Sequence, residues 1–225
     1  VWMLLAGMAG GSVYFYTENT ALGITQVSNV AFLLCMAPLF TTFLSILFFR
    51  EEKLGANLFG GSLLALIGVA LVVFSGVSLK INPLGDFLTL GAALSWAIYS
   101  VLIRRLSARY STVFLTRKVF FYGVLSIIPA FFFHPFTPSI GQLLSPSICF
   151  NLLFLAVVAS LGCFVLWNVV LKKLGIVHTS NYIYLSPLVS LAGSAVLLGE
   201  RMTPIALLGA TCILCGVYWA EKKIH

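Results

Sequence analysis

The stretch EKLGANLFGGSLLALIGV at residues 52–69 recurs in pattern as ERMTPIALLGATCILCGV at residues 200–217. Both copies have a glutamate followed by a basic residue, then a glycine nine positions after the glutamate and Gly-Val sixteen positions after it. Matches continue upstream: Pro38-Leu39 with Pro187-Leu188, Gly23-Ile24 with Gly175-Ile176, and Ser28-Asn29 with Ser180-Asn181. An internal repeat of this length indicates two similar structural units.

The composition places these units in a membrane. Hydrophobic residues make up 60% of the 225 residues and charged residues only 8%, whereas a soluble domain has about 25% charged residues. The five cysteines lie in or beside apolar runs. Cys212 and Cys215 have the spacing of a redox or metal site, but no second pair of ligands lies nearby, so we interpret them as small helix-packing residues. The sequence predicts no metal and no cofactor.

The apolar segments predict an all-α, polytopic membrane protein with about eight transmembrane helices. A helix needs about 20 apolar residues to cross the hydrocarbon. Segments near that length lie at residues 1–17, 25–49, 55–76, 85–104, 114–134, 149–171, 177–199 and 204–221. Thr17-Glu18-Asn19 is expected to end the first span. Asp86 is expected to cap the fourth span or complement its dipole, with a solvated loop acid as the alternative.

The basic residues predict the orientation. If successive connections alternate sides, one side receives eleven of the thirteen, Arg50, Lys53, Arg104, Arg105, Arg109, Arg117, Lys118, Lys172, Lys173, Lys222 and Lys223. The other side receives only Lys80 and Arg201. Lysine and arginine collect in cytoplasmic loops, so the C-terminus is expected in the cytoplasm. The net charge of +7 therefore reflects topology, and we expect no nucleic-acid partner.

The number of predicted spans between the two copies of the repeat implies that the copies have opposite orientations in the membrane. The first three predicted spans correspond to the sixth, seventh and eighth, so equivalent spans lie five apart and have opposite orientations. The fourth and fifth spans lack counterparts, and the chain starts without a methionine. We therefore expect two further spans before Val1, completing a five-plus-five inverted repeat. Residues 1–76 would form part of the first repeat and 82–225 the second. Inverted repeats are typical of secondary carriers whose substrate site lies near the bilayer midplane.

Polar and aromatic side chains within spans are the candidate substrate contacts, because polar groups are costly in hydrocarbon. Trp96, Tyr99 and Ser100 share one helix face at i, i+3 and i+4, which predicts cavity lining, with core packing as the alternative. Asn29, Asn181 and Tyr184 occupy equivalent regions of the second and seventh spans. The two asparagines could bind substrate or bond between helices. A second tier contains Tyr14, Trp167 and Asn168, with interfacial anchoring an alternative for Trp167.

Two further pairs of equivalent residues indicate where the predicted helices bend and where they end. Pro38 and Pro187 lie within predicted spans and favour kinks. Glu52 and Glu200 fall at span ends, where a cap or ion pair is the favoured reading and gating or proton coupling the alternative. Since no acidic residue lies near the centre of a predicted span, facilitated diffusion or exchange is favoured over proton coupling.

The ordered set of motifs resembles the EamA-type ten-span carriers of the drug/metabolite transporter superfamily. The pieces that carry the resemblance are Asn19-Thr20-Ala21-Leu22, residues 38–52 and 61–69, Gly85-Asp86, Ser95-Trp96-Ala97-x-Tyr99, Arg104-Arg105-Leu106, and residues 187–200 and 209–217. They cover nearly the whole chain. The resemblance implies export or exchange of small metabolites, such as amino acids, through a central cavity. This sequence departs from the pattern by the missing first two spans and an extra residue between Pro38 and Glu52.

The expected function is a secondary transporter of small metabolites that works by alternating access in a cell membrane, with a bacterial inner membrane favoured by the short loops. The expected partners are a small-molecule substrate and the lipid bilayer, and the sequence sets no oligomeric state. A membrane enzyme such as a lipid-linked transferase is an alternative, although the chain has no DxxD, HExxH or Gly-rich phosphate loop. A non-transporting membrane partner protein is a third possibility.

Overall fold

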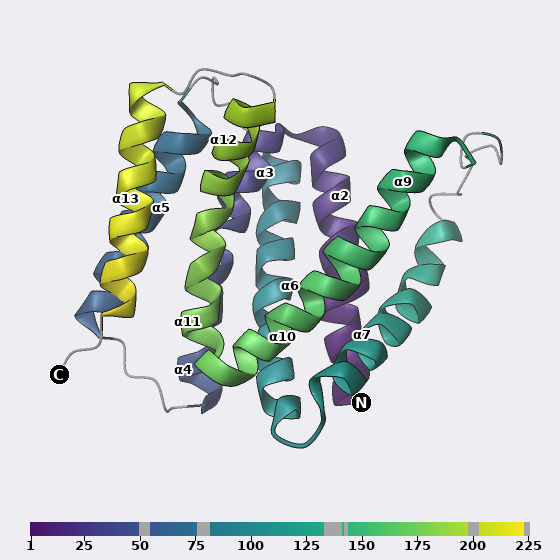
Figure 1. Ribbon diagram of the computed structural model, residues 1–225. Coiled ribbons are helices and arrows are strands. Elements are labelled where there is room, and N and C mark those ends of the chain that lie inside the picture. The colour runs from purple at the N-terminus through teal and green to yellow at the C-terminus, as the bar shows by residue number, and fades with distance from the viewer. Residues whose placement is uncertain (50–54, 76–81, 133–140, 142–143, 198–202, 223–225) are drawn as a thin grey trace.

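The computed structural model describes residues 1–49, 55–75, 82–132, 141, 144–197 and 203–222, and their regular structure is helical (Figure 1). Glu52 and Glu200, with the basic residues Arg50, Lys53, Lys80, Arg201 and Lys223, lie outside these ranges. The first half contains α1 (Trp2–Gly7), the π-helical η1 (Met8–Val13), α2 (Tyr14–Ile24), α3 (Val27–Leu34), α4 (Ala37–Phe49), α5 (Ala56–Val73) and α6 (Pro83–Ser107). The second half contains α7 (Thr112–Ile127), the 3-10 segment η2 (Ile128–Phe132), α9 (Pro146–Phe154), the π-helical η3 (Leu155–Gly162), α10 (Cys163–Leu174), α11 (Ile176–Asn181), the 3-10 segment η4 (Tyr182–Leu185), α12 (Ser186–Leu197) and α13 (Pro204–Glu221).

Six helical stretches of the described chain are long and apolar enough to cross a membrane. They are Val27–Phe49, Ala56–Val73, Pro83–Ser107, Thr112–Phe132, Pro146–Leu174 and Pro204–Glu221. The two other predicted spans are also helical, as the consecutive segments α1–η1–α2 and α11–η4–α12. The protein is therefore a polytopic helical membrane protein, as the composition predicts.

The first helix does not end where the sequence predicted. It continues past Thr17-Glu18-Asn19 to Ile24, because the polar side chains bond back to the helix. The Thr17 hydroxyl donates to the Val13 carbonyl at 2.8 Å, and the Asn19 amide donates to the Phe15 carbonyl at 2.7 Å. Such local bonds satisfy the polar groups within the helix. The predicted break at Thr17-Glu18-Asn19 is therefore wrong, and the helix reaches the extended residue Thr25.

Local capping chemistry sets the start of α6. Asn82 is its N-cap, and its side chain accepts a hydrogen bond from the Gly85 amide at 3.3 Å. Asp86 lies in the first turn, where its carboxylate accepts from the Asn82 amide at 3.1 Å and complements the helix dipole. The dipole interpretation of Asp86 is confirmed, while the cap itself is Asn82. Thr203 begins α13 in the same way, accepting from the Ala206 amide.

Both proline-containing spans are broken next to the proline. Before Pro38, the Cys35 and Met36 amides bond to the Phe32 and Leu33 carbonyls, three residues back, and separate α3 from α4. Before Pro187, the 3-10 segment η4 separates α11 from α12. Proline has no amide hydrogen and clashes with the preceding turn, so each helix changes pitch there. The sequence predicted kinks at both prolines, and the structure shows the regular α-helix interrupted at each.

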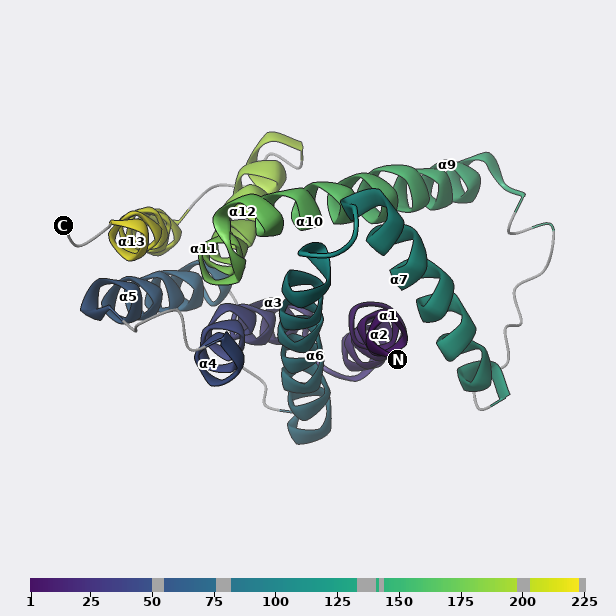
Figure 2. The same cartoon turned by 90° about the horizontal axis from the view of Figure 1, so that it is seen from below.

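The helices α5 and α13 form a closely packed antiparallel pair at one edge of the molecule (Figures 1 and 2). Glycines let their backbones touch: a Cβ added to Gly68 would lie 2.6 Å from the Gly209 carbonyl oxygen, and one added to Gly61 would lie 2.5 Å from that of Gly216. Small residues at such crossings permit close helix contact. The four glycines therefore bring the two helix backbones into direct contact.

The contacts between α5 and α13 have the same symmetry as the sequence repeat. The repeat matches Gly61 with Gly209 and Gly68 with Gly216. Exchanging the copies turns the contact of Gly61 with Gly216 into the contact of Gly209 with Gly68, and both contacts are present. A two-fold relation between antiparallel copies has this property.

Most of the remaining helices pack around α6 (Figure 2). The segment α1–η1–α2 lies against α6 and α7, α4 lies against α6 and α11, and α9–η3–α10 runs obliquely along one side. A cluster of buried residues from α1, η1, α6, α7, α10 and α11 forms the main core. The N-terminus, the C-terminal end of α13 and the C-terminal ends of α6 and α10, with Arg104, Arg105, Lys172 and Lys173, lie at the same end of the molecule (Figure 1).

Candidate functional site

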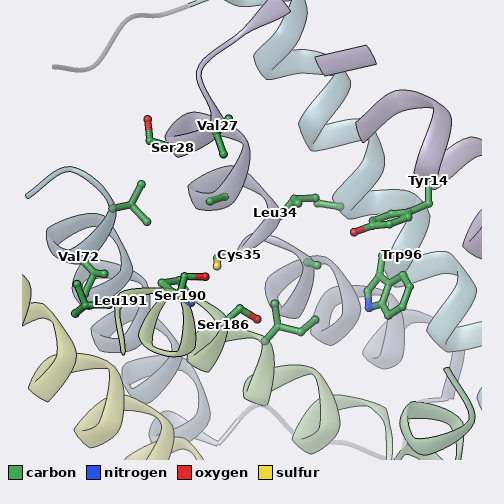
Figure 3. Close-up of a pocket in the computed structure, with 16 residues that line it drawn as sticks. Tyr14, Val27, Ser28, Leu34, Cys35, Val72, Trp96, Ser186, Ser190 and Leu191 are labelled. Atoms are coloured by element: carbon green, nitrogen blue, oxygen red, sulfur yellow. The ribbon is translucent and has the colours of Figure 1, made fainter. Parts of the chain in front are cut away.

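A pocket of about 580 Å³ lies among α2, α3, α5, α6 and α12 (Figure 3). It extends from the first residues of α3 and the last residues of α5 to the middle of α6. The lining residues are Tyr14, Val27, Ser28, Ala31, Leu34, Cys35, Ala37, Val72, Val73, Ala93, Trp96, Ile183, Ser186, Pro187, Ser190 and Leu191. Pockets of this volume accommodate small molecules.

The two helix breaks shape this pocket. Leu34, Cys35 and Ala37 come from the break before Pro38, and Ile183, Ser186 and Pro187 come from the break at η4. Equivalent positions of the two sequence repeats therefore face the same cavity from different helices. Broken helices free backbone carbonyls and amides at mid-membrane depth, which is tolerated where they border a cavity.

Aromatic rings form one wall of the pocket. The Trp96 ring lies 5.1 Å from the Tyr14 ring, and 5.3 to 5.5 Å from those of Tyr99, Trp167 and Phe164. These neighbours fix the Trp96 side chain in place. Its indole nitrogen is buried and has no hydrogen-bond partner among the described residues, and it lies on the side of the ring that faces the cavity (Figure 3). The wall thus offers an unused hydrogen-bond donor.

Tyr14 links the pocket to a carboxylate. It is the first residue of α2, and its hydroxyl donates to Glu18 Oε1 at 3.2 Å, one helical turn further along. Glu18 is partly buried, and among the described residues it takes part in no ion pair. The Tyr14 hydroxyl oxygen is directed toward the cavity (Figure 3).

The rest of the lining is apolar or carries hydroxyl groups. Three serines, Ser28, Ser186 and Ser190, reach the pocket, and the sequence places no charged side chain among its lining residues. In the described part of the chain, three or more histidines, cysteines or acids do not come together as a metal site would require. This surface suits a small molecule that is partly apolar and has a few hydrogen-bonding groups.

Tyr14 and Trp96 are the predicted site residues that line the pocket. Tyr99, Ser100, Asn168 and Trp167 lie behind them. The Tyr99 hydroxyl donates to Asn168 Oδ1 at 2.9 Å, and Asn168 Nδ2 donates to the Thr116 hydroxyl at 3.0 Å. The Ser100 hydroxyl donates to the Trp96 carbonyl within its own helix. These contacts make Tyr99 and Asn168 members of a buried polar network that supports the aromatic wall.

The two equivalent asparagines make interhelical bonds. Asn29 Nδ2 donates to Asp86 Oδ1 at 3.4 Å, which joins α3 to α6. Asn181 Nδ2 donates to Glu221 Oε1 at 3.1 Å, which joins α11 to α13, and Glu221 also contacts His178 Nδ1 at 2.7 Å. These bonds lie at opposite ends of the bundle. Tyr184 is fully buried in the cluster around Val69 and Ile213.

Glu18 and the serines of α12 were not among the predicted site residues. Ser186 and Ser190 are spaced i, i+4 on the span that contains Pro187, a periodicity that would have placed them on one face. Glu18 was assigned to a loop because its neighbours Thr17 and Asn19 resemble a turn. Its position beside Tyr14 follows only from the continuation of α2.

Together, the helical bundle, the broken helices and the central pocket define the chain as a polytopic membrane protein of the transporter class. The model of the EamA-like transporter family matches residues 1–74 and 83–220. The chain belongs to this family, as the sequence motifs predicted. Family membership makes the protein a transporter and not an enzyme, and gives it a small-molecule substrate.

Two relatives and one protein of known structure are similar to this chain over most of its length. A probable amino-acid metabolite efflux pump of Escherichia coli (strain K12) is 26% identical over 205 residues, which cover 88% of this chain and 69% of that protein. A probable terminal-alkyne amino-acid exporter of Streptantibioticus cattleyicolor is 25% identical over 221 residues, which cover 97% of this chain and 72% of that protein. A protein of known crystal structure superposes with a TM-score of 0.82 at 21% identity, covering 98% of this chain and 75% of its own. That similarity concerns the fold.

Proposed function

We propose that this protein is a secondary transporter that exports or exchanges small metabolites, amino acids or related compounds, by alternating access. The observation that carries the proposal is the pocket at the two proline breaks, because residues of both sequence repeats line it. A site between two similar halves can open alternately to either side. The names of the E. coli and Streptantibioticus relatives, which refer to amino-acid efflux and export, support this substrate class.

The orientation is part of the proposal. The pocket occupies the half of the bundle near the α2–α3 connection. The basic residues at the ends of α6 and α10 lie at the other end, which the positive-inside rule assigns to the cytoplasm. The pocket then faces outward, the C-terminus is cytoplasmic, and the membrane is a cell membrane such as a bacterial inner membrane.

The division into two inverted repeats is proposed on the same basis. Residues 1–76 would belong to the first and 82–225 to the second. The contact pattern of α5 and α13, which exchanging the copies leaves unchanged, supports this division. In this scheme the α5–α13 pair stays together while the surrounding helices rearrange around the pocket.

Counterflow in proteoliposomes tests the proposal. Vesicles preloaded with an unlabelled amino acid should accumulate the labelled form transiently when they contain the protein, and protein-free vesicles should not. A panel should cover apolar, polar, acidic and basic amino acids and organic acids. Absence of exchange across the whole panel would contradict the proposed transport of small metabolites.

A further inference from the structure

We propose that Glu18, Tyr14 and Trp96 form a subsite for a protonated amine, so that the transported compounds are amino acids or amines with an apolar remainder. This inference rests on the proposed transport function and assigns a substrate class to the same pocket. It adds Glu18, a residue outside the pocket lining, as the counter-charge of the site.

The hydrogen bond between Tyr14 and Glu18 sets the polarity of the subsite. The Tyr14 hydroxyl has one hydrogen, which it donates to Glu18 Oε1. The lone pairs of the hydroxyl oxygen, which is directed toward the cavity (Figure 3), remain free to accept. A hydroxyl that donates to a carboxylate is polarised and becomes a stronger acceptor. Tyr14 therefore presents an electron-rich oxygen to the pocket, and the Glu18 carboxyl group lies directly behind it.

The charge of Glu18 lacks a cationic partner within the described protein. It is in no ion pair there, and the sequence places no lysine, arginine or histidine among the residues that line the pocket. A partly buried carboxylate gains most from an opposite charge in its low-dielectric surroundings. A substrate ammonium group at the Tyr14 hydroxyl would supply that charge.

The aromatic wall favours the same group. The Tyr14 and Trp96 rings lie 5.1 Å apart and are tilted by 50° to each other, and aromatic faces attract ammonium groups within about 6 Å of a ring centroid. The free indole N–H of Trp96 can donate to a carboxylate or carbonyl of the same substrate. An amine and a carboxyl group one carbon apart would use both features.

The opposite side of the pocket selects the remainder of the substrate. Leu34, Val72, Val73 and Leu191 supply an apolar surface. A net anion without an amine would meet Glu18 and find no basic side chain among the lining residues, and an unpaired buried charge is unfavourable. The pocket should therefore discriminate by the amine and accept an aliphatic side chain.

Three compounds of one shape test this inference on the unaltered protein. L-leucine has both groups, isoamylamine lacks the carboxylate, and isocaproate lacks the amine. In a counterflow assay with labelled L-leucine, we expect isoamylamine to compete and isocaproate to be at least about tenfold weaker, because charge-assisted hydrogen bonds are lost. Equal competition by isocaproate would overturn the amine subsite.

Two variants test whether Glu18 and Tyr14 cause the preference for an amine. Glu18→Gln keeps the shape of the side chain and removes its charge, and Tyr14→Phe removes the hydroxyl. We expect each to raise the half-saturating concentration of L-leucine about tenfold, and to reduce the advantage of isoamylamine over isocaproate. Tyr218→Phe, on an exposed residue of α13, is the matched control and should leave both unchanged.

The outcomes separate this inference from the proposed function. Wild-type counterflow of L-leucine that is insensitive to Glu18→Gln and Tyr14→Phe would overturn the subsite and leave the transporter in place. Exchange of isocaproate without exchange of either amine would do the same. Absence of exchange for the whole metabolite panel would contradict the transport function itself. Size-exclusion profiles of the solubilised variants show whether each one folds.

Discussion

Asn168 joins three helices through one carboxamide. It lies on α10, accepts from Tyr99 of α6 and donates to Thr116 of α7, and 1% of its surface is exposed. An amide satisfied on both sides at this depth fixes the relative positions of its partners. The aromatic wall rests on this network, because Tyr99 packs against Trp96. The network therefore affects the pocket without lining it.

Asn168→Ala should lower stability, because it removes the acceptor of the buried Tyr99 hydroxyl and the interhelical bond to the Thr116 hydroxyl. Interhelical hydrogen bonds in membranes contribute about 0.6 kcal/mol on average and up to roughly 1.7 kcal/mol, and we expect a loss in this range. The melting temperature of the detergent-solubilised protein measures it. Asn151→Ala, at an exposed position of α9, is the control, and an equal loss in both variants would contradict the role of the network.

Trp96→Phe distinguishes the contribution of the indole N–H from that of the aromatic ring. Phenylalanine keeps an aromatic surface for Tyr14 and Tyr99, so stability should change little, while the donor that faces the pocket is lost. We expect the half-saturating concentration for a carboxylate-bearing substrate in counterflow to rise about tenfold, and that for an amine without a carboxylate to stay constant. Equal effects on both substrates would show that the ring, and not the N–H, matters.

At the scale of elements, several helix starts and the breaks at the two prolines were predictable, whereas the end of the first helix and the contacts between helices were not. Thr203-Pro204 and Asn82-Pro83 mark starts through groups that touch within one turn, and Pro38 and Pro187 mark breaks by the same local logic. By contrast, the bonds from Asn29 to Asp86 and from Asn181 to Glu221 connect residues that are distant in sequence. Both asparagines were candidate substrate contacts, because the sequence alone left their partners open.

The pocket residues likewise divide into those that local sequence could identify and those that depend on how the helices pack. Tyr14 and Trp96 could be identified because aromatic side chains with polar groups lie within predicted spans, where polar groups are costly unless they face a cavity or a partner. Glu18 was assigned to a connection, because Thr17 and Asn19 favour turns unless their side chains bond back to the helix. The cavity between the two proline breaks depends on how the two repeats pack, and residue spacing alone does not encode that packing.

The α5–α13 pair depends on glycines at the crossing. Gly68→Ala would place a methyl group 2.6 Å from the Gly209 carbonyl oxygen, so the helices must separate. Overpacking of this kind costs about 1–3 kcal/mol, and the melting temperature of the solubilised protein should fall accordingly. Gly91→Ala, within α6 and with no atom within 4 Å of the added carbon apart from the neighbouring backbone of its own helix, should be neutral or slightly stabilising. A similar loss for both would contradict close packing as the cause.

At the scale of the molecule, the inverted repeat makes a prediction about sidedness. Leu22 and Leu174 are equivalent positions one residue before the matched glycines Gly23 and Gly175. Both are exposed, with 38% and 50% of their surface accessible. Parallel repeats would place them on the same face of the membrane, and inverted repeats place them on opposite faces.

Cysteine labelling in intact cells distinguishes these arrangements. In a variant whose five native cysteines are replaced by alanine, Leu22→Cys should react with a membrane-impermeant maleimide added outside. Leu174→Cys should react only after the cells are permeabilised, because the basic residues Lys172 and Lys173 beside it favour the cytoplasmic side. Ala108→Cys, exposed next to Arg109, serves as the cytoplasmic control. Labelling of Leu22→Cys and Leu174→Cys from the same side would contradict the inverted repeat and, with it, the outward orientation of the pocket.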